Sequence, residues 1–292
     1  MPRSSMLFPR TLLLLALFFG VALPVQAALE VECPGSVGEG EPFVVRVHSD
    51  TPLESVTIRF LGKELRPVVS EGEGRAQAWA LLGIGMHERR SGSEFPLVIE
   101  AQTPTESLVE KRTIRRTDKK YEEQWLDVAD KFLNLKGYEL KRHHLEQEAV
   151  KQALARISPS RAYTLPLTKP VDGRTSSTYG LRRFFNKIPK RPHSGWDIAA
   201  TEGTPAVACA DGLVTLAGDH FFAGNSVYID HGQGLVSMYF HLSKIEVAEG
   251  QAVRRGETVG LIGATGRVTG PHLHWGISVL GELVDPNLLV GN

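Results

Sequence analysis

The sequence predicts a mainly β protein with three parts: an N-terminal β-sandwich of immunoglobulin-like type, a two-helix linker, and a C-terminal domain built on a curved antiparallel β-sheet. Three observations predict this order. Short alternating apolar runs separated by Gly, Pro, Ser and Asp fill residues 28–117, and a helical period replaces them over residues 118–160. Short strands with glycine turns then occupy residues 161–292. We therefore expect two globular domains joined by a helical linker.

Residues 1–27 have the pattern of a secretory signal. Arg3 and Arg10 precede the apolar run from Thr11 to Leu23, and small residues follow it. This run of about thirteen residues is shorter than the roughly twenty that a membrane-spanning helix needs. We expect cleavage near Ala28, export across the inner membrane to the periplasm or cell envelope, and no stable membrane anchor, with an uncleaved anchor as the alternative.

Charge and cysteine content exclude two further classes of protein. Arg3 and Arg10 are the only charged residues of the signal segment, so 31 of the 33 basic residues and all 33 acidic residues remain after it. This near-neutral balance argues against a nucleic-acid partner, which would call for a basic patch. The two cysteines, Cys33 and Cys209, lie in different predicted domains and do not make a disulfide framework.

The first domain is predicted from five short alternating runs between turn residues. They cover residues 29–33, 42–47, 55–60, 76–81 and 95–100. No catalytic grouping stands among them.

The linker is predicted to form two amphipathic helices, because apolar residues recur three or four positions apart in two stretches. The first stretch ends before Gly137 and the second before Pro159, both of which are residues that end helices. The apolar positions are Trp125, Ala129, Phe132 and Leu133, followed by Leu145, Ala149, Ala153, Leu154 and Ile157.

In the C-terminal domain, two histidines stand two residues apart in a strand-like stretch. Alternation sends His272 and His274 to one face of the strand, while Leu273 and Trp275 point into an apolar layer. Two imidazoles on one polar face are candidates for a metal site. The spacing alone does not decide which of them binds the metal.

Two more stretches present polar side chains in the same way. His193 and Asp197 project together past a glycine if their segment is extended, and Ser237, Tyr239 and His241 share one side of an alternating run. One histidine in a strand is more often a hydrogen-bonded structural residue. Three such stretches together predict a metal centre, since a catalytic zinc takes three ligands from the protein.

Three motifs stand in order in this half of the chain: HSGWD at 193–197, YFHLS at 239–243 and GPHLH at 270–274. With the phrases SSTYGLR, GTPAVACADGLV, GNSVYIDHG and VRRGETVGLIGATGRVTG, they resemble the lysostaphin-type (LytM-like) zinc endopeptidase family. The resemblance covers the chain from about Tyr163 to the C-terminus. The preceding part looks similar to the N-terminal domain that often precedes this peptidase fold in secreted bacterial proteins.

The resemblance implies one Zn²⁺ ion held by His193, Asp197 and His274. It assigns His274, and not His272, to the metal. Water at the fourth position of such a site has its pKa brought down to about 7.

The same resemblance makes His272 and His241 the catalytic residues that orient water and return a proton to the leaving amine. Three residues are candidates for substrate binding. Arg182 either orients substrate or pairs with an acid, Asn225 ends a loop that could wall a substrate groove, and Tyr239 shares the predicted face of His241.

The substrate implied for a secreted bacterial member of this family is peptidoglycan, cut at its peptide cross-links. In a Gram-negative cell the bond would be the D,D cross-link between D-Ala and diaminopimelate, and in some Gram-positive cells a glycine bridge. The alternative, of a different class, is a non-catalytic cell-wall-binding regulator that activates an amidase. All the metal-ligand positions are intact, which favours the enzyme, and a regulatory protein is left open as a second partner.

Overall fold

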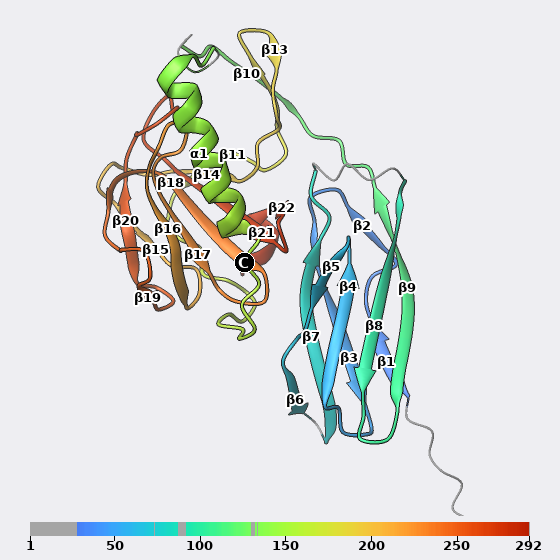
Figure 1. The fold of residues 1–292 in the computed structure, drawn as a ribbon. Coiled ribbons are helices and arrows are strands. Elements are labelled where there is room, and N and C mark those ends of the chain that lie inside the picture. The colour runs from blue at the N-terminus through green and yellow to red at the C-terminus, as the bar shows by residue number, and fades with distance from the viewer. Residues whose placement is uncertain (1–27, 73, 87–91, 130–131, 133, 292) are drawn as a thin grey trace, which may run out of the picture.

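The computed structural model describes residues 28–72, 74–86, 92–129, 132 and 134–291. The predicted signal segment therefore lies outside the described residues. The described chain is mainly β, as predicted, and forms two β domains that lie side by side (Figure 1). In this part of the chain, no helix is both long and apolar enough to span a membrane.

The N-terminal domain consists of two sheets packed face to face (Figure 1). Side chains alternate between core and solvent along its strands, and Phe43 of one sheet meets Phe60 of the other edge to face at 5.5 Å. This agrees with the predicted sandwich, and its immunoglobulin-like type stays a prediction. One sheet has the order β1 (Leu29–Glu32), β3 (Pro42–Ser49), β7 (Arg75–Gly83), β6 (Val69–Gly72). The other has the order β2 (Ser36–Gly38), β9 (Ser107–Thr117), β8 (Glu94–Gln102), β4 (Ser55–Phe60), β5 (Lys63–Leu65).

The linker differs from its prediction in its first half. The second predicted helix forms as α1 (Gly137–Leu154), but the first does not, because Glu123–Leu126 is a strand, β10. β10 pairs in parallel with β12 (Arg182–Phe185) of the C-terminal domain, and Trp125 stacks on Phe184 at 4.2 Å. Pairing with a distant strand therefore overrides the helical spacing of the apolar residues.

The C-terminal domain is built on one large, mostly antiparallel sheet, as predicted. Its path runs β11 (Arg174–Ser177), β14 (Trp196–Ala199), β21 (Leu273–Val279), β18 (Leu235–Ile245), β17 (Gly224–Asp230), β16 (Gly212–His220), β19 (Ala252–Val253). Off this path lie β15 (Pro205–Val207), β20 (Thr258–Ile262) and β22 (Glu282–Val284), while β13 (Ile188–Pro189) pairs with β12 and η2 (Pro286–Leu289) ends the fold.

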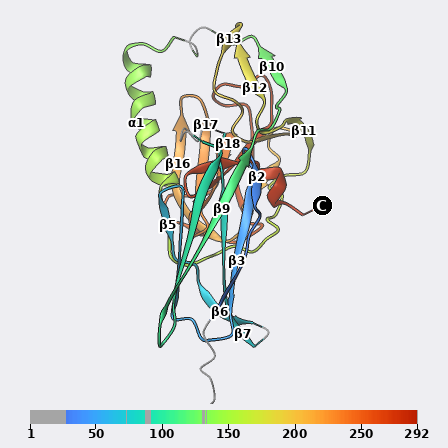
Figure 2. The same cartoon turned by 90° about the vertical axis from the view of Figure 1, so that its right-hand side faces the viewer.

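α1 covers part of the large sheet, where it lies against β16 (Figure 2). Its C-terminal turns contribute Ala153, Val150 and Leu154 to a small apolar cluster with Tyr228 of β17 and Met238 of β18. The exposed side of the helix carries Tyr138, Leu140 and Leu145 among its polar residues, and Leu145, at 64% exposure, does not pack in the apolar stripe predicted for it. Packing against the sheet therefore fixes the helix through its last turns.

The two domains share one continuous hydrophobic core, which includes Ile84 of the first domain and Val284 of the second. The guanidinium of Arg161 lies 3.7 Å from the ring centre of Trp79 and donates to its carbonyl at 3.0 Å. A Cβ at Gly83 would come within 2.5 Å of Val284 Cγ1, so the domains touch closely there. The interface is packed like an interior.

Candidate metal centre

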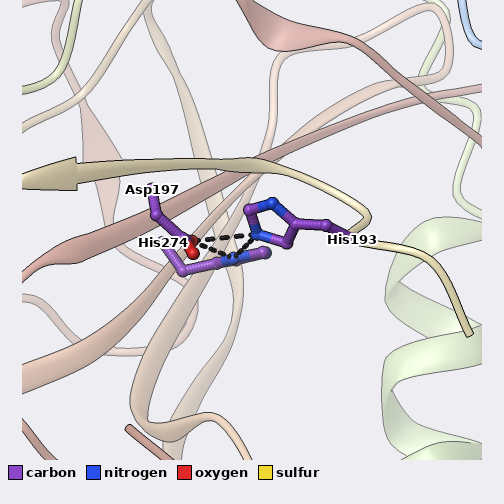
Figure 3. A group of neighbouring side chains, drawn as sticks. All are labelled: His193, Asp197 and His274. Carbon is purple, nitrogen blue, oxygen red and sulfur yellow. Dashed lines mark hydrogen bonds and ion pairs between the residues drawn. The ribbon is translucent and has the colours of Figure 1, made fainter. Parts of the chain in front are cut away.

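Three side chains from neighbouring segments meet at one point (Figure 3). Asp197 on β14 lies directly opposite His274 on β21 in the antiparallel register, and His193 stands in the segment before β14. Asp197 Oδ1 lies 2.9 Å from His193 Nε2 and 2.8 Å from His274 Nδ1, and the two nitrogens lie 2.9 Å apart. All three residues are buried.

Gly195 makes this approach possible. A Cβ at this position would lie 2.6 Å from His274 Nε2 and 2.6 Å from the carbonyl oxygen of Trp275. Contacts that close are not tolerated, so a side chain here would push the ring of His274 out of the cluster. The glycine between His193 and Asp197 thus leaves the room that the sequence predicts.

A backbone hydrogen bond fixes the protonation of His193. His193 Nδ1 lies 2.7 Å from the carbonyl oxygen of Thr178, so this nitrogen carries the proton and donates it. Burial lowers the pKa of His193 to about 4, which leaves the ring neutral near pH 7 and its Nε2 with a lone pair.

A lone pair on His193 Nε2 therefore faces a carboxylate oxygen at 2.9 Å. Two acceptors at this distance repel each other unless a cation lies between them. Two imidazole nitrogens and one carboxylate oxygen form a donor set that zinc accepts. The residues present fit a zinc ion.

Two more histidines lie beside the cluster. Nδ1 of His241 donates a hydrogen bond to the carbonyl oxygen of Thr265 at 2.9 Å. Nδ1 of His272 donates to the carbonyl oxygen of Gly270 at 2.8 Å. Nε2 is then the nitrogen of each ring that is left to meet water or substrate, and in His272 it lies 3.8 Å from Asp197 Oδ1. Burial lowers the pKa of His241 to about 3, so this ring is also neutral near pH 7.

The cluster opens into a groove of about 330 Å³. Its lining comes from β10 and the residues after it, from strands β11, β12, β14, β18 and β21, and from the loops between β16 and β17 and before β21. Phe222 and Ala223 belong to the loop between β16 and β17, so the loop expected to wall a substrate groove does so. A groove with the metal cluster at its base can admit an extended chain.

A model of peptidase family M23 matches residues 191–286. The crystal structure of a candidate M23 peptidase from Pseudomonas aeruginosa is 35% identical, with a TM-score of 0.62, and the alignment covers 87% of this chain and 94% of that one. The chain belongs to peptidase family M23.

Two curated relatives match over less than half of the chain. Peptidoglycan DD-endopeptidase ShyA of Vibrio cholerae is 48% identical over 120 residues, which is 40% of this chain and 28% of the relative. DD-carboxypeptidase/endopeptidase Mpg of Neisseria meningitidis is 45% identical over 113 residues, which is 39% of this chain and 26% of the relative. The chain thus spans little more than a quarter of the length of either M23 relative.

Of the predicted site residues of this M23 chain, His193, Asp197 and His274 come together, and His241 and His272 adjoin them. The prediction that Tyr239 contacts substrate is wrong. Tyr239 is fully buried, and its hydroxyl accepts a hydrogen bond from the backbone N–H of Cys209 in the core.

The prediction placed Tyr239 and His241 on one face of the strand, but the structure places them on different faces. The cause is the backbone at His241, which has a φ of 65°. The register between β17 and β18 shifts at the same place, so the strand carries a bulge there. Phe240 and His241 consequently both line the groove, while Tyr239 faces inward. Phe240 stacks on the ring of His274 at 5.1 Å and holds its orientation.

The structure also places the other two predicted substrate-binding residues, Arg182 and Asn225, outside the groove lining. Arg182 lies 3.6 Å from Glu123 at the surface, so it pairs with an acid. Asn225 donates its side-chain N–H to the carbonyl of Ser243 and its backbone N–H to Thr265, so it supports the loop that holds His241.

Sequence reasoning missed two residues that contact or adjoin the cluster. Arg183 Nη2 lies 3.1 Å from Asp197 Oδ2, and Gln124 accepts a hydrogen bond from Arg183 Nε at 2.9 Å. The pair of adjacent arginines in the chain was a signal for Arg183, since alternation sends only one of them toward the sheet. No pattern in the linker marked Gln124.

Proposed function

We propose that this M23 chain is a zinc-dependent endopeptidase that hydrolyses the peptide cross-links of bacterial peptidoglycan. The observation that carries the proposal is the convergence of His193, Asp197 and His274 beside a groove, with the imidazoles of His241 and His272 next to them. The name of one curated relative, a peptidoglycan DD-endopeptidase, supports the substrate class, and the other is named a DD-carboxypeptidase/endopeptidase.

His193 Nε2, Asp197 Oδ1 and His274 Nδ1 are the atoms that would hold the ion. A zinc ion bound there supplies a Lewis acid that polarises a peptide carbonyl and lowers the pKa of water. Arg183 engages the second oxygen of Asp197, so the carboxylate presents one oxygen to the cluster. Thr178 fixes the ring of His193 in the tautomer that a ligand needs.

His241 and His272 act on the substrate side of the site. Their rings lie 4.9 Å apart, and each is held through Nδ1 by a backbone carbonyl. Each Nε2 can take a proton from the attacking water and return one to the leaving amine, the role of a general base and acid. Once protonated, the same nitrogen donates a hydrogen bond to the carbonyl oxygen as its negative charge grows.

The finer assignment is the D,D cross-link between D-Ala and diaminopimelate, because the relatives are named as DD-endopeptidases. Peptidoglycan as substrate also supports action in the periplasm or cell envelope, to which the predicted signal segment would direct the chain.

Purified zinc-loaded chain incubated with isolated sacculi tests the proposal. Mass spectrometry of the soluble products should show stem peptides released from cross-linked dimers. The non-catalytic regulator predicts no release by the chain alone and increased release when an amidase is added. The His272→Ala variant, assayed in parallel, excludes a contaminating hydrolase.

A further inference from the structure

We propose that Gln124, on the linker strand β10, is a positioning residue for the metal site, acting through Arg183 on Asp197. The proposal deepens the proposed function and rests on it for the identity of the metal. It goes beyond the family match, which begins at residue 191 and does not include β10.

The contacts form an unbroken path from the linker to the cluster. Gln124 Oε1 accepts a hydrogen bond from Arg183 Nε at 2.9 Å, and Gln124 Nε2 donates to Ser177 Oγ at 2.8 Å. Arg183 Nη2 in turn donates to Asp197 Oδ2 at 3.1 Å. Ser177 pairs with Asp197 across β11 and β14, so the amide of Gln124 ties together the two elements that flank the carboxylate.

The geometry gives each oxygen of Asp197 a separate task. Oδ1 faces the two histidine nitrogens and Oδ2 faces the guanidinium of Arg183. The side chain of Arg183 is 18% exposed, and arginine has many rotamers, so the direction of its planar fork must be set by partners. Gln124 is the acceptor for its Nε–H, and without that acceptor a largely buried donor is left unpaired.

β10 is held in place by contacts that do not depend on the metal site. Trp125 stacks on Phe184 with an angle of 8° between the rings. Asn186 accepts from the backbone N–H of Val128 at 2.8 Å and donates to its carbonyl at 3.0 Å. The linker strand is therefore a fixed part of the site, and the functional unit includes β10.

The zinc dissociation constant of the full chain, measured by competition with a chromophoric chelator, tests the relay without substrate. Gln124→Met keeps the length of the side chain and removes both hydrogen bonds. Loss of an outer partner of a ligand commonly weakens metal binding by 10- to 100-fold, and we expect about 10-fold here because Arg183 intervenes. Glu123→Gln is the matched control. Glu123 is the neighbour of Gln124 on β10 and forms an ion pair with exposed Arg182, so this substitution should leave the dissociation constant unchanged.

Two further variants separate positioning from general damage. Gln124→Glu keeps the acceptor for Arg183, and the hydroxyl of Ser177 can turn to donate to it, so zinc affinity should stay within about threefold of the parent. Arg183→Met should weaken zinc binding by about 10- to 100-fold, and adding Gln124→Met to it should cost nothing more, because both act on one path. The unfolding temperature of every variant is recorded alongside.

Zinc binding by Gln124→Met equal to that of Glu123→Gln would overturn the relay, and so would losses that multiply in the double variant. Should Gln124→Met not fold, Gln124→Asn takes its place, because its amide is one methylene too short to reach both partners and the same loss is expected. Failure of the relay is distinct from failure of the proposed function. A chain that binds zinc but releases nothing from sacculi refutes the function and leaves the relay intact.

Discussion

Replacing Gly195 by alanine should weaken zinc binding at the metal site while the fold survives. The new Cβ would lie 2.6 Å from both His274 Nε2 and the Trp275 carbonyl oxygen, whereas ordinary contact begins at 3.4 Å. The ring or the backbone of β21 must therefore move by about 0.8 Å, the difference between these two distances. Ligand atoms tolerate displacements of about 0.2 Å.

The size of the effect follows from that displacement. Overpacking of this kind costs about 1–3 kcal/mol of folding stability. A misplaced ligand should weaken zinc binding by at least 10-fold, which corresponds to about 1.4 kcal/mol. Turnover on sacculi at limiting zinc should fall with occupancy.

Gly218→Ala supplies the comparison. Gly218 also lies in a strand of the large sheet, but a Cβ there meets nothing within 4 Å. Zinc dissociation constants and thermal unfolding are measured for both variants. A Gly195→Ala protein that binds zinc within threefold of Gly218→Ala would refute the steric reasoning.

Zinc content, turnover and unfolding separate the roles of the histidines. His274→Ala should lose zinc and activity together. His272→Ala and His241→Ala should stay zinc-loaded at saturating metal, while their turnover falls by about 10²- to 10⁴-fold. A His272→Ala protein without zinc would reverse the assignment of ligand and base. Chelation should abolish hydrolysis and lower the unfolding temperature, and zinc should restore both; hydrolysis that survives complete chelation contradicts metal dependence. Burial lowers the pKa of His241 to about 3, from about 6.5 in the unfolded chain, so below about pH 6.5 the unfolded chain takes up a proton that the folded chain does not. The free energy of unfolding of the chelated protein should therefore fall as the pH drops below about 6.5. An equal dependence of that free energy on pH in His241→Gln would contradict this cause.

The polar faces of β14 and β21 were predictable because these two strands alternate regularly, whereas the choice of His274 over His272 came from the family resemblance. β21 sends His274 to one face and Leu273 and Trp275 to the other, and β14 does the same for Asp197. A period of two residues is a local property, so the sequence carries it directly.

His241 faces the site, but the argument that predicted this, regular alternation along the strand, is wrong. Regular alternation places it beside Tyr239, yet the positive φ at His241 turns its ring to the groove and leaves Tyr239 in the core. A bulge is fixed by the register of the neighbouring strand, which the stretch itself does not encode.

The prediction of a first linker helix was wrong for a related reason. Trp125, Ala129 and Phe132 have helical spacing, but their partners Phe184, Phe221 and the groove lie far along the chain. β9 was missed too, because of the eleven residues in that strand only Ile114 is fully buried, so its alternation is weak. Contacts with distant segments decided the linker strand, whereas β9 forms by antiparallel pairing with β8, its neighbour in the chain.

The shared core of the two domains makes them one thermodynamic unit. Ile84 and Val284 belong to the same buried cluster, and Trp79 is sandwiched by Arg161 on its face and by the edge-on ring of Tyr163. Separating the domains would expose these apolar groups to water at a cost of about 25 cal/mol for each Å². Calorimetry of the chain should accordingly give a single cooperative endotherm whose van't Hoff and calorimetric enthalpies agree. The N-terminal domain is in this sense a structural half of the chain that cannot be exchanged for another module without rebuilding the surface it covers.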